Sequence, residues 1–204
     1  MYKIIDSVEN TITIQKSEFI THIYRVNSIE EINSILEETR KKYYDATHNC
    51  YAYILGENQD IQKCSDDGEP QKTAGAPMMN VLKQNDMTNI LAIVTRYFGG
   101  ILLGAGGLIR AYSSAVSEAL KLCKRYVTKE VSLYMLTTSY SSYNNLINIK
   151  DINIIDSSFT NDVIITFGIA KEKENGLEEL LYKNKIDVTS LKKIQESLIE
   201  IPAE

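Results

Sequence analysis

Half of the ten glycines lie within nine residues, 99–107, and this cluster constrains the fold more than any other feature of the chain. It follows an apolar segment, 90–94, which indicates a buried strand. It precedes an apolar stripe at helical spacing, formed by Leu108, Ala111, Tyr112, Ala115, Val116, Ala119, Leu120 and Cys123. Glycine allows left-handed backbone angles and close approach to a ligand. Strand, glycine-rich loop and helix therefore predict either an anion site at a helix start or a tight turn that packs the helix on a sheet.

Two well-known phosphate-binding motifs are absent from the glycine cluster. A GxGxxG pattern that starts at Gly104 would need glycine where Ile109 stands. A Walker loop would need a lysine and a hydroxyl residue after the last glycine. The cluster is therefore interpreted from its chemistry rather than from a named motif.

Arginine and tyrosine side chains around the cluster suit a phosphate or a nucleic acid. Arginine binds phosphate oxygens in a bidentate manner, and tyrosine rings stack on bases. The alternative, left open by the sequence, is that Arg96 and Arg110 pair with the acidic residues near position 67. The predicted anion- or RNA-binding residues are Lys72, Arg96, Tyr97, Gly99, Gly100, Gly104, Gly106, Gly107, Arg110 and Tyr112.

A second polar segment, 65–70, holds three carboxylates in four residues. Such a group could hold Mg²⁺ or provide an acid and a base, but it equally suits a solvated turn, and no EF-hand spacing is present. No metal site and no cofactor are therefore expected, with Asp66, Asp67 and Glu69 as weak metal candidates. The predicted motif loop consists of His48, Asn49, Asp66, Asp67, Gly68, Glu69 and Thr73. A catalytic pair of His48 with Cys50 is disfavoured, because the simpler interpretation of Cys50 is a buried, unreactive thiol.

The patterning predicts an α+β protein with two domains, 1–130 and 131–204, separated where arginine disappears from the composition. In the first domain we expect strands at 11–14, 19–26, 48–55, 61–64 and 90–94, with helices at 29–42, from Pro77 to 84, and from 108 onward. A capping box at Ser28 and Glu31 marks the start of the first helix. In the second domain we expect the order strand, helix, strand, strand, helix, strand at 131–138, 141–149, 152–158, 162–170, 174–184 and 195–201, which is that of a ferredoxin-like plait.

Charge and composition exclude several classes of protein. The net charge is −5, and residues 1–130 hold 15 Lys and Arg against 16 Asp and Glu. No global basic field can therefore hold nucleic acid, and any anion site must be local. There is no apolar run long enough for a membrane helix, no signal-peptide core and no disulfide framework among three widely spaced cysteines. We expect a cytoplasmic protein with no membrane association; its oligomeric state is not predicted.

Three segments together resemble the IMPACT family, whose bacterial members are called YigZ. They are 46–52 (ATHNCYA), 65–77 (SDDGEPQKTAGAP) and 96–112 (RYFGGILLGAGGLIRAY). The resemblance implies a first domain with the two-layer α/β fold shared by a small-subunit ribosomal protein, RNase PH and elongation factor G domain IV, including a left-handed βαβ crossover. It implies a second, ferredoxin-like domain similar to elongation factor G domain V. The eukaryotic members of the family regulate translation through protein partners.

Three functions follow as hypotheses. The first is a non-enzymatic factor that binds RNA or the ribosome through residues 63–112, in connection with translation or its regulation. The second is an enzyme that acts on a phosphorylated or nucleotide-like small molecule. The third is a protein-interaction regulator that docks a partner on the polar loop. The sequence favours the first, then the third, and favours no enzymatic activity.

Overall fold

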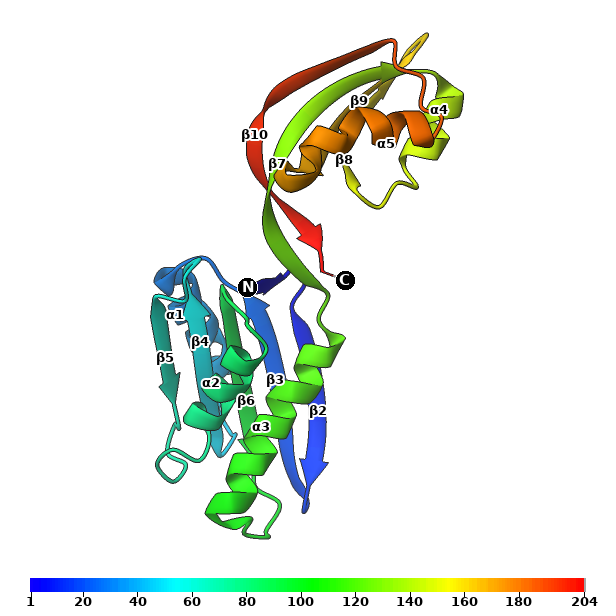
Figure 1. Cartoon of the computed structure of the whole chain (residues 1–204). Coiled ribbons are helices and arrows are strands. Elements are labelled where there is room, and N and C mark those ends of the chain that lie inside the picture. The colour runs from blue at the N-terminus through cyan, green and yellow to red at the C-terminus, as the bar shows by residue number, and fades with distance from the viewer. Residues whose placement is uncertain (204) are drawn as a thin grey trace. The chain divides into compact units, whose positions relative to one another are not determined.

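The computed structural model describes residues 1–203, which form a mixed α/β protein with two antiparallel sheets (Figure 1). The chain divides into two compact units. The first comprises Met1–Val127 and the end of the chain from Pro202, and the second comprises Thr128–Ile201. No helix among the described residues is long and apolar enough to cross a membrane.

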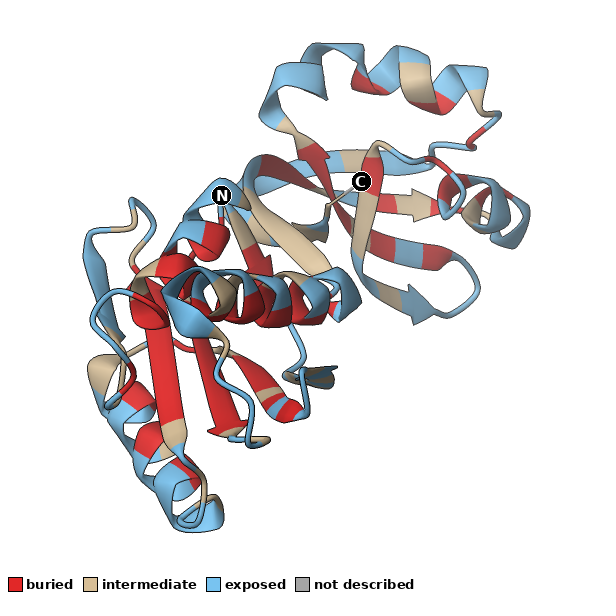
Figure 2. Cartoon of the chain, turned by 90° about the horizontal axis from the view of Figure 1, so that it is seen from below, coloured by how far each residue is buried: buried red, intermediate tan, exposed pale blue. Residues whose placement is uncertain are grey.

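The first unit is built on a five-stranded antiparallel sheet. In spatial order its strands are β2 (Val8–Ile14), β3 (Ser17–Arg25), β6 (Ile90–Tyr97), β4 (His48–Leu55) and β5 (Ile61–Ser65). Strands β4 and β6 lie side by side and are buried almost along their whole length, as the red ribbon in Figure 2 shows. Continuous burial explains why both sequences are apolar at successive positions rather than at alternate ones.

Helices cover both faces of this sheet, so the unit has three layers instead of the two that the resemblance implied. Tyr51, Tyr53 and Leu55 of β4 face α1 (Ile29–Lys42), whereas Cys50, Ala52 and Ile54 face α2 (Gly75–Gln84) and α3 (Gly104–Leu122). Successive side chains of a strand point to opposite faces, and those of β4 are apolar on both. Both faces of the sheet must therefore be covered by helices.

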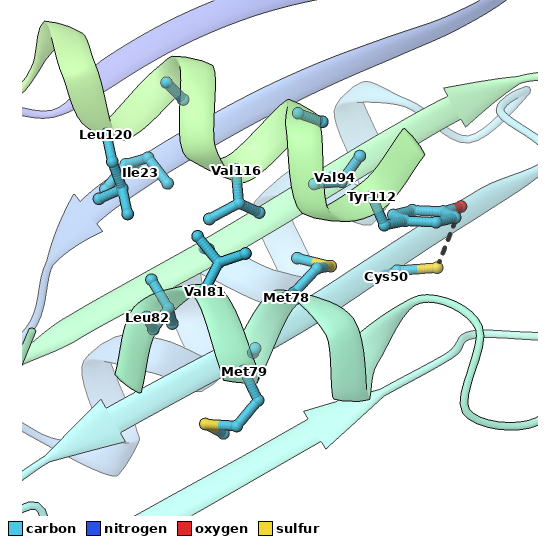
Figure 3. Packing of buried hydrophobic residues seen from close by; sticks show 14 of the residues in the cluster. Ile23, Cys50, Met78, Met79, Val81, Leu82, Val94, Tyr112, Val116 and Leu120 are labelled. Carbon is cyan, nitrogen blue, oxygen red and sulfur yellow. Dashed lines mark hydrogen bonds between the residues drawn. The ribbon is translucent and has the colours of Figure 1, made fainter. Parts of the chain in front are cut away.

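The main core lies between the sheet and the pair α2 and α3 (Figure 3). Met78, Val116 and Leu120 from the two helices are at most 1% exposed. Each large apolar side chain buried in this way contributes about 1.5–3 kcal/mol relative to exposure. The core thereby holds the first turn of α3 in a fixed place beside the end of β6.

The second unit follows the expected element order. Strand β7 (Arg125–Thr138) leads into it and is followed by α4 (Tyr140–Leu146), β8 (Ile152–Phe159), β9 (Val163–Ala170), the 3-10 turn Lys171–Gly176, α5 (Leu177–Lys183) and β10 (Ser190–Pro202). Strand β7 lies between β9 and β10, and β8 is beyond β9. Leu136, Phe167 and Leu181 join strands to helices in one apolar core.

Several boundaries differ from those expected. A short strand, β1 (Tyr2–Ile4), was not anticipated; it pairs with the start of β7, which itself begins six residues early. Helix α3 begins at Gly104 instead of residue 108, because its first turn carries glycines and so shows no apolar periodicity. Helix α2 begins at Gly75 instead of Pro77. Its start depends on the carboxylate of Asp66, which accepts hydrogen bonds from Ala74 and Gly75 and lies too far back in the chain to look like a cap.

Candidate functional site

Asp66 holds the acidic loop against the start of α2. Its Oδ1 accepts from the backbone N–H of Ala74 (3.0 Å) and Gly75 (2.9 Å), and its Oδ2 accepts from that of Lys72 (2.8 Å). Burial raises the pKa of Asp66, but these three bonds outweigh it and leave the pKa below its usual value. The carboxylate therefore serves as a structural cap.

The remaining motif-loop residues fasten the loop to β4. Asp67 accepts from the backbone N–H of Asn49 through its carboxylate (2.7 Å) and from His48 Nδ1 through its carbonyl (2.8 Å). Gly68 packs on the imidazole, since a Cβ there would lie 3.3 Å from Nδ1. Thr73 donates to the Pro70 carbonyl (2.6 Å). The loop is thus held by hydrogen bonds between its side chains and backbone groups of the protein.

Glu69 and Arg96 form a buried ion pair, which settles for Arg96 the alternative that the sequence left open. The Glu69 side chain is 2% exposed, and its Oε1 accepts from Arg96 Nη1 (2.6 Å) and from the Tyr112 hydroxyl (2.7 Å). His48 Nε2 lies 3.7 Å from the second carboxylate oxygen. Among the described residues, no partner is available to the buried Nε of Arg96. The charge of Arg96 is therefore mostly neutralised inside the protein.

Tyr112 cannot stack on a base in this structure, which corrects the role expected for it. The side chain is completely buried, donates to Glu69, and accepts from the Cys50 thiol at 3.4 Å (Figure 3). Burial raises the pKa of both the phenol and the thiol, so both stay protonated. Cys50 is a buried structural thiol rather than a nucleophile.

Tyr97 remains partly exposed at the end of β6, and its hydroxyl donates to Asp45 (2.8 Å). This hydrogen bond raises the pKa of Tyr97 to about 12. Gly99 has a packing role, since a Cβ would lie 2.0 Å from the Lys16 backbone, whereas Gly100 has a φ of +82°. The glycine-rich segment therefore divides in two: 99 and 100 lie in the bend that follows β6, and 104, 106 and 107 lie in the first turn of α3.

A pocket of about 360 Å³ opens between the end of β6, the motif loop and the start of α3. Its apolar lining consists of Pro70, Phe98, Leu102, Leu103, Ala105 and Leu108. Its polar lining consists of Thr47, His48, Glu69 and Arg96, and Gly104 completes it. The pocket thus combines apolar walls with a polar floor whose main ion pair is already formed.

Two predicted cationic residues lie on the surface near this pocket. Arg110 is exposed one turn into α3, and its Nη1 would be 3.6 Å from a Cβ built on Gly106. Lys72 is exposed two residues after Pro70, which lines the pocket. Neither side chain forms a described ion pair within residues 1–203, and α3 itself has no side-chain cap and no acidic residue in its first turn. Positive charge is therefore available at this end of the unit.

Sequence reasoning missed the apolar lining. Phe98 and Leu102 are 45% and 86% exposed; Phe98 stands directly before Gly99, and Leu102 lies in the apolar run 101–103 between Gly100 and Gly104. An apolar run inside a glycine-rich loop is a detectable signal, because such a loop is normally polar.

The structure is a two-unit α/β protein in which the three sequence motifs meet around one pocket, and comparison with known proteins identifies the family. The model of the Impact N-terminal domain matches residues 15–120, which is more than half of the chain. The IMPACT family member YigZ of Escherichia coli (strain K12) is 35% identical over 165 residues, covering 78% of this chain and 81% of YigZ. This chain belongs to the IMPACT family, as the three sequence motifs indicated.

Other relatives are consistent with that assignment. The IMPACT family member YvyE of Bacillus subtilis (strain 168) is 54% identical over 112 residues, and the match spans 55% of this chain but only 52% of YvyE. A solved structure described as a hypothetical protein matches 95% of this chain and 96% of its own, with 30% identity and a TM-score of 0.60. A structure of the two-domain translational regulator Yih1 matches with a TM-score of 0.40 and 23% identity, a likeness too distant to indicate fold or function.

Proposed function

We propose that this chain is a non-catalytic cytoplasmic factor that binds RNA or the ribosome, in connection with translation or its regulation. The observation that carries the proposal is the uncapped, glycine-rich start of α3, which borders the pocket. The first N–H groups of a helix have no intrahelical partners, and the helix dipole favours negative charge there. A backbone phosphate is the ligand that this arrangement fits best.

The surface cations add to this anion site. Arg110 lies against the first turn of α3, and Lys72 is exposed two residues after Pro70, which lines the pocket; we propose that both side chains approach a phosphate bound at the helix start. Arg96 acts indirectly in this proposal, because its ion pair with Glu69 shapes the floor of the pocket. The phosphate ligands are therefore the backbone of α3, Arg110 and Lys72.

The finer fold assignments belong to the same proposal. Strands β5 and β6 each pair antiparallel with β4, so they are parallel to each other and are joined through α2. We propose this connection as the left-handed crossover of the ribosomal-protein and RNase PH fold. The second unit, with β7 between β9 and β10, is proposed as the ferredoxin-like domain similar to elongation factor G domain V.

Protein docking is a second candidate, because Phe98 and Leu102 expose apolar surface beside the pocket. A phosphate-processing enzyme has less support, because Asp66, Asp67 and Glu69 each accept hydrogen bonds from different parts of the protein. Retention of a partner after nuclease treatment, and its loss in Leu102→Asp, would favour protein docking over RNA.

Sedimentation with purified ribosomes at low and moderate salt tests the main proposal. Wild type should pellet at low salt and be released at moderate salt, and Lys72→Ala/Arg110→Ala should stay in the supernatant. The matched control is Lys83→Ala/Lys121→Ala, which removes two exposed cations from the last turns of α2 and α3. If wild type does not pellet at either salt, or if both double variants behave alike, the proposed site is wrong.

A further inference from the structure

We infer that the pocket beside α3 receives one unpaired nucleotide, with its base inside the pocket and its phosphate on the first turn of the helix. The inference rests on the proposed RNA association and names the form of RNA that this site accepts. It depends on the volume and lining of the pocket, on its aromatic wall and on two details that the packing of the protein does not explain.

The size and lining of the pocket suit a single base. A volume of about 360 Å³ lies at the lower end of the range for small-ligand sites, and the walls are mostly apolar. A base paired in a duplex is stacked on both sides and cannot enter such a pocket. An unpaired base can be turned out of the strand and stacked on an aromatic ring.

Phe98 provides that ring. It lines the pocket, is 45% exposed, and has the Arg96 guanidinium 5.6 Å from its centroid. Stacking on aromatic side chains tolerates any base, because each base has a π face. The aromatic contact therefore favours single strands without selecting a sequence.

The floor of the pocket carries polar groups that a base edge can meet. His48 lines the pocket, and its Nδ1 donates to the Asp67 carbonyl, so Nε2, which lies 3.7 Å from the Glu69 carboxylate, is the ring nitrogen left for a ligand group. Arg96, whose side chain is 6% exposed, borders the same pocket with an Nε that has no partner among the described residues. A buried donor without a partner is unusual in a protein interior, and the packing around Arg96 does not explain it.

Gly106 is the second unexplained detail. Its φ is not in the left-handed region, and a Cβ there would make only an ordinary contact, 3.6 Å from Arg110 Nη1. Alanine would therefore fit and would favour the helix more strongly. Glycine leaves the first turn of α3 bare beside the pocket, as close approach of a phosphate requires.

Fluorescence anisotropy with a labelled RNA of about 12 nucleotides, single-stranded or annealed to its complement, tests this inference. We expect the single strand to bind at least about tenfold more tightly than the duplex. Phe98→Ala should weaken single-strand binding about tenfold, as for the loss of one base–aromatic stack, and leave duplex binding unchanged. Gly106→Ala should weaken it about threefold or more.

The matched control is Ile109→Ala, an exposed apolar residue of α3 that does not line the pocket, and it should bind like wild type. Equal binding of single strand and duplex, or full binding by Phe98→Ala, would overturn the inference. The proposed RNA association would still stand in that case if Lys72→Ala/Arg110→Ala reduces binding. Failure of wild type to bind either RNA or ribosomes would remove both.

Discussion

At the scale of single residues, the most informative feature is that charged groups near the pocket differ sharply in their surroundings. Glu69 and Arg96 are buried and paired, whereas Arg110 and Lys72 face solvent. Burying two charges costs desolvation free energy, so the complete ion pair adds little net stability. Removing one partner leaves the other charge buried and unpaired, which lowers stability strongly. Substitutions can therefore distinguish Arg96, which stabilises the fold, from Arg110 and Lys72, which are proposed to bind a ligand.

Arg96→Ala should lower the free energy of unfolding by about 3–5 kcal/mol, because it leaves the Glu69 carboxylate buried without its main partner. Replacing both residues in Arg96→Leu/Glu69→Leu should recover part of this loss. Chemical denaturation measures both effects. The control, Arg40→Ala, removes an exposed cation 4.0 Å from Asp67 and should change stability by less than about 0.5 kcal/mol. An equal loss in Arg96→Ala and the double variant would contradict the burial argument.

Asp66→Asn should destabilise the protein by about 1–3 kcal/mol at pH 7, since an amide cannot accept all three backbone N–H bonds. The pKa of Asp66 is lowered on folding, so its stabilisation is complete above the unfolded pKa and is lost as the pH falls through the folded pKa. The difference between wild type and variant should therefore shrink below about pH 4. Urea denaturation at pH 7 and pH 3 would detect this, and a difference independent of pH would refute it.

At the scale of elements, α3 combines a rigid apolar face with an exposed glycine-rich start. Its stripe from Leu108 to Leu120 was predictable from periodicity, as were β4 and α1, whose observed bounds match the expected ones. The start of α3 was not predictable, because glycines carry no periodic signal and disfavour helix. The cap of α2 could not be predicted for another reason. Asp66 lies nine residues before Gly75 and accepts its N–H hydrogen bond only because the loop between them folds back.

Gly106→Ala should raise the free energy of unfolding by about 0.5–1 kcal/mol, because the new Cβ has room and alanine favours helix. Gly99→Ala should do the opposite, because its Cβ would lie 2.0 Å from the Lys16 backbone. Thermal unfolding of the two variants gives a direct comparison. Destabilisation by Gly106→Ala would mean that this glycine has a packing role after all.

The site was only partly accessible from the sequence. Residue types and their proximity along the chain indicated the motif loop, the glycines and Arg110. The burial of individual side chains could not be inferred in the same way. Tyr112, for example, lies on the apolar stripe of α3 but carries a polar hydroxyl, so the sequence is compatible with either a buried or an exposed ring. Only the three-dimensional packing distinguishes Arg96, which is paired inside, from Arg110, which is exposed outside.

At the scale of the whole molecule, an overall charge of −5 requires that the proposed RNA association be local. A site that holds one or two phosphates of a single strand predicts a slope of log K against log salt of about −0.7 to −1.4, since each phosphate contributes about −0.7. Titration of the labelled RNA at several salt concentrations gives this slope. A slope steeper than about −4 would indicate an extended basic surface, which this account does not contain.

Ultraviolet cross-linking of bound RNA, followed by mass spectrometry of the cross-linked peptides, locates the RNA on the protein. Cross-linked nucleotides should map to the segment from Phe98 to Leu108, and Lys72→Ala/Arg110→Ala should abolish them. Cross-links confined to the second unit, Thr128–Ile201, would contradict the proposed site, because RNA would then bind away from the start of α3.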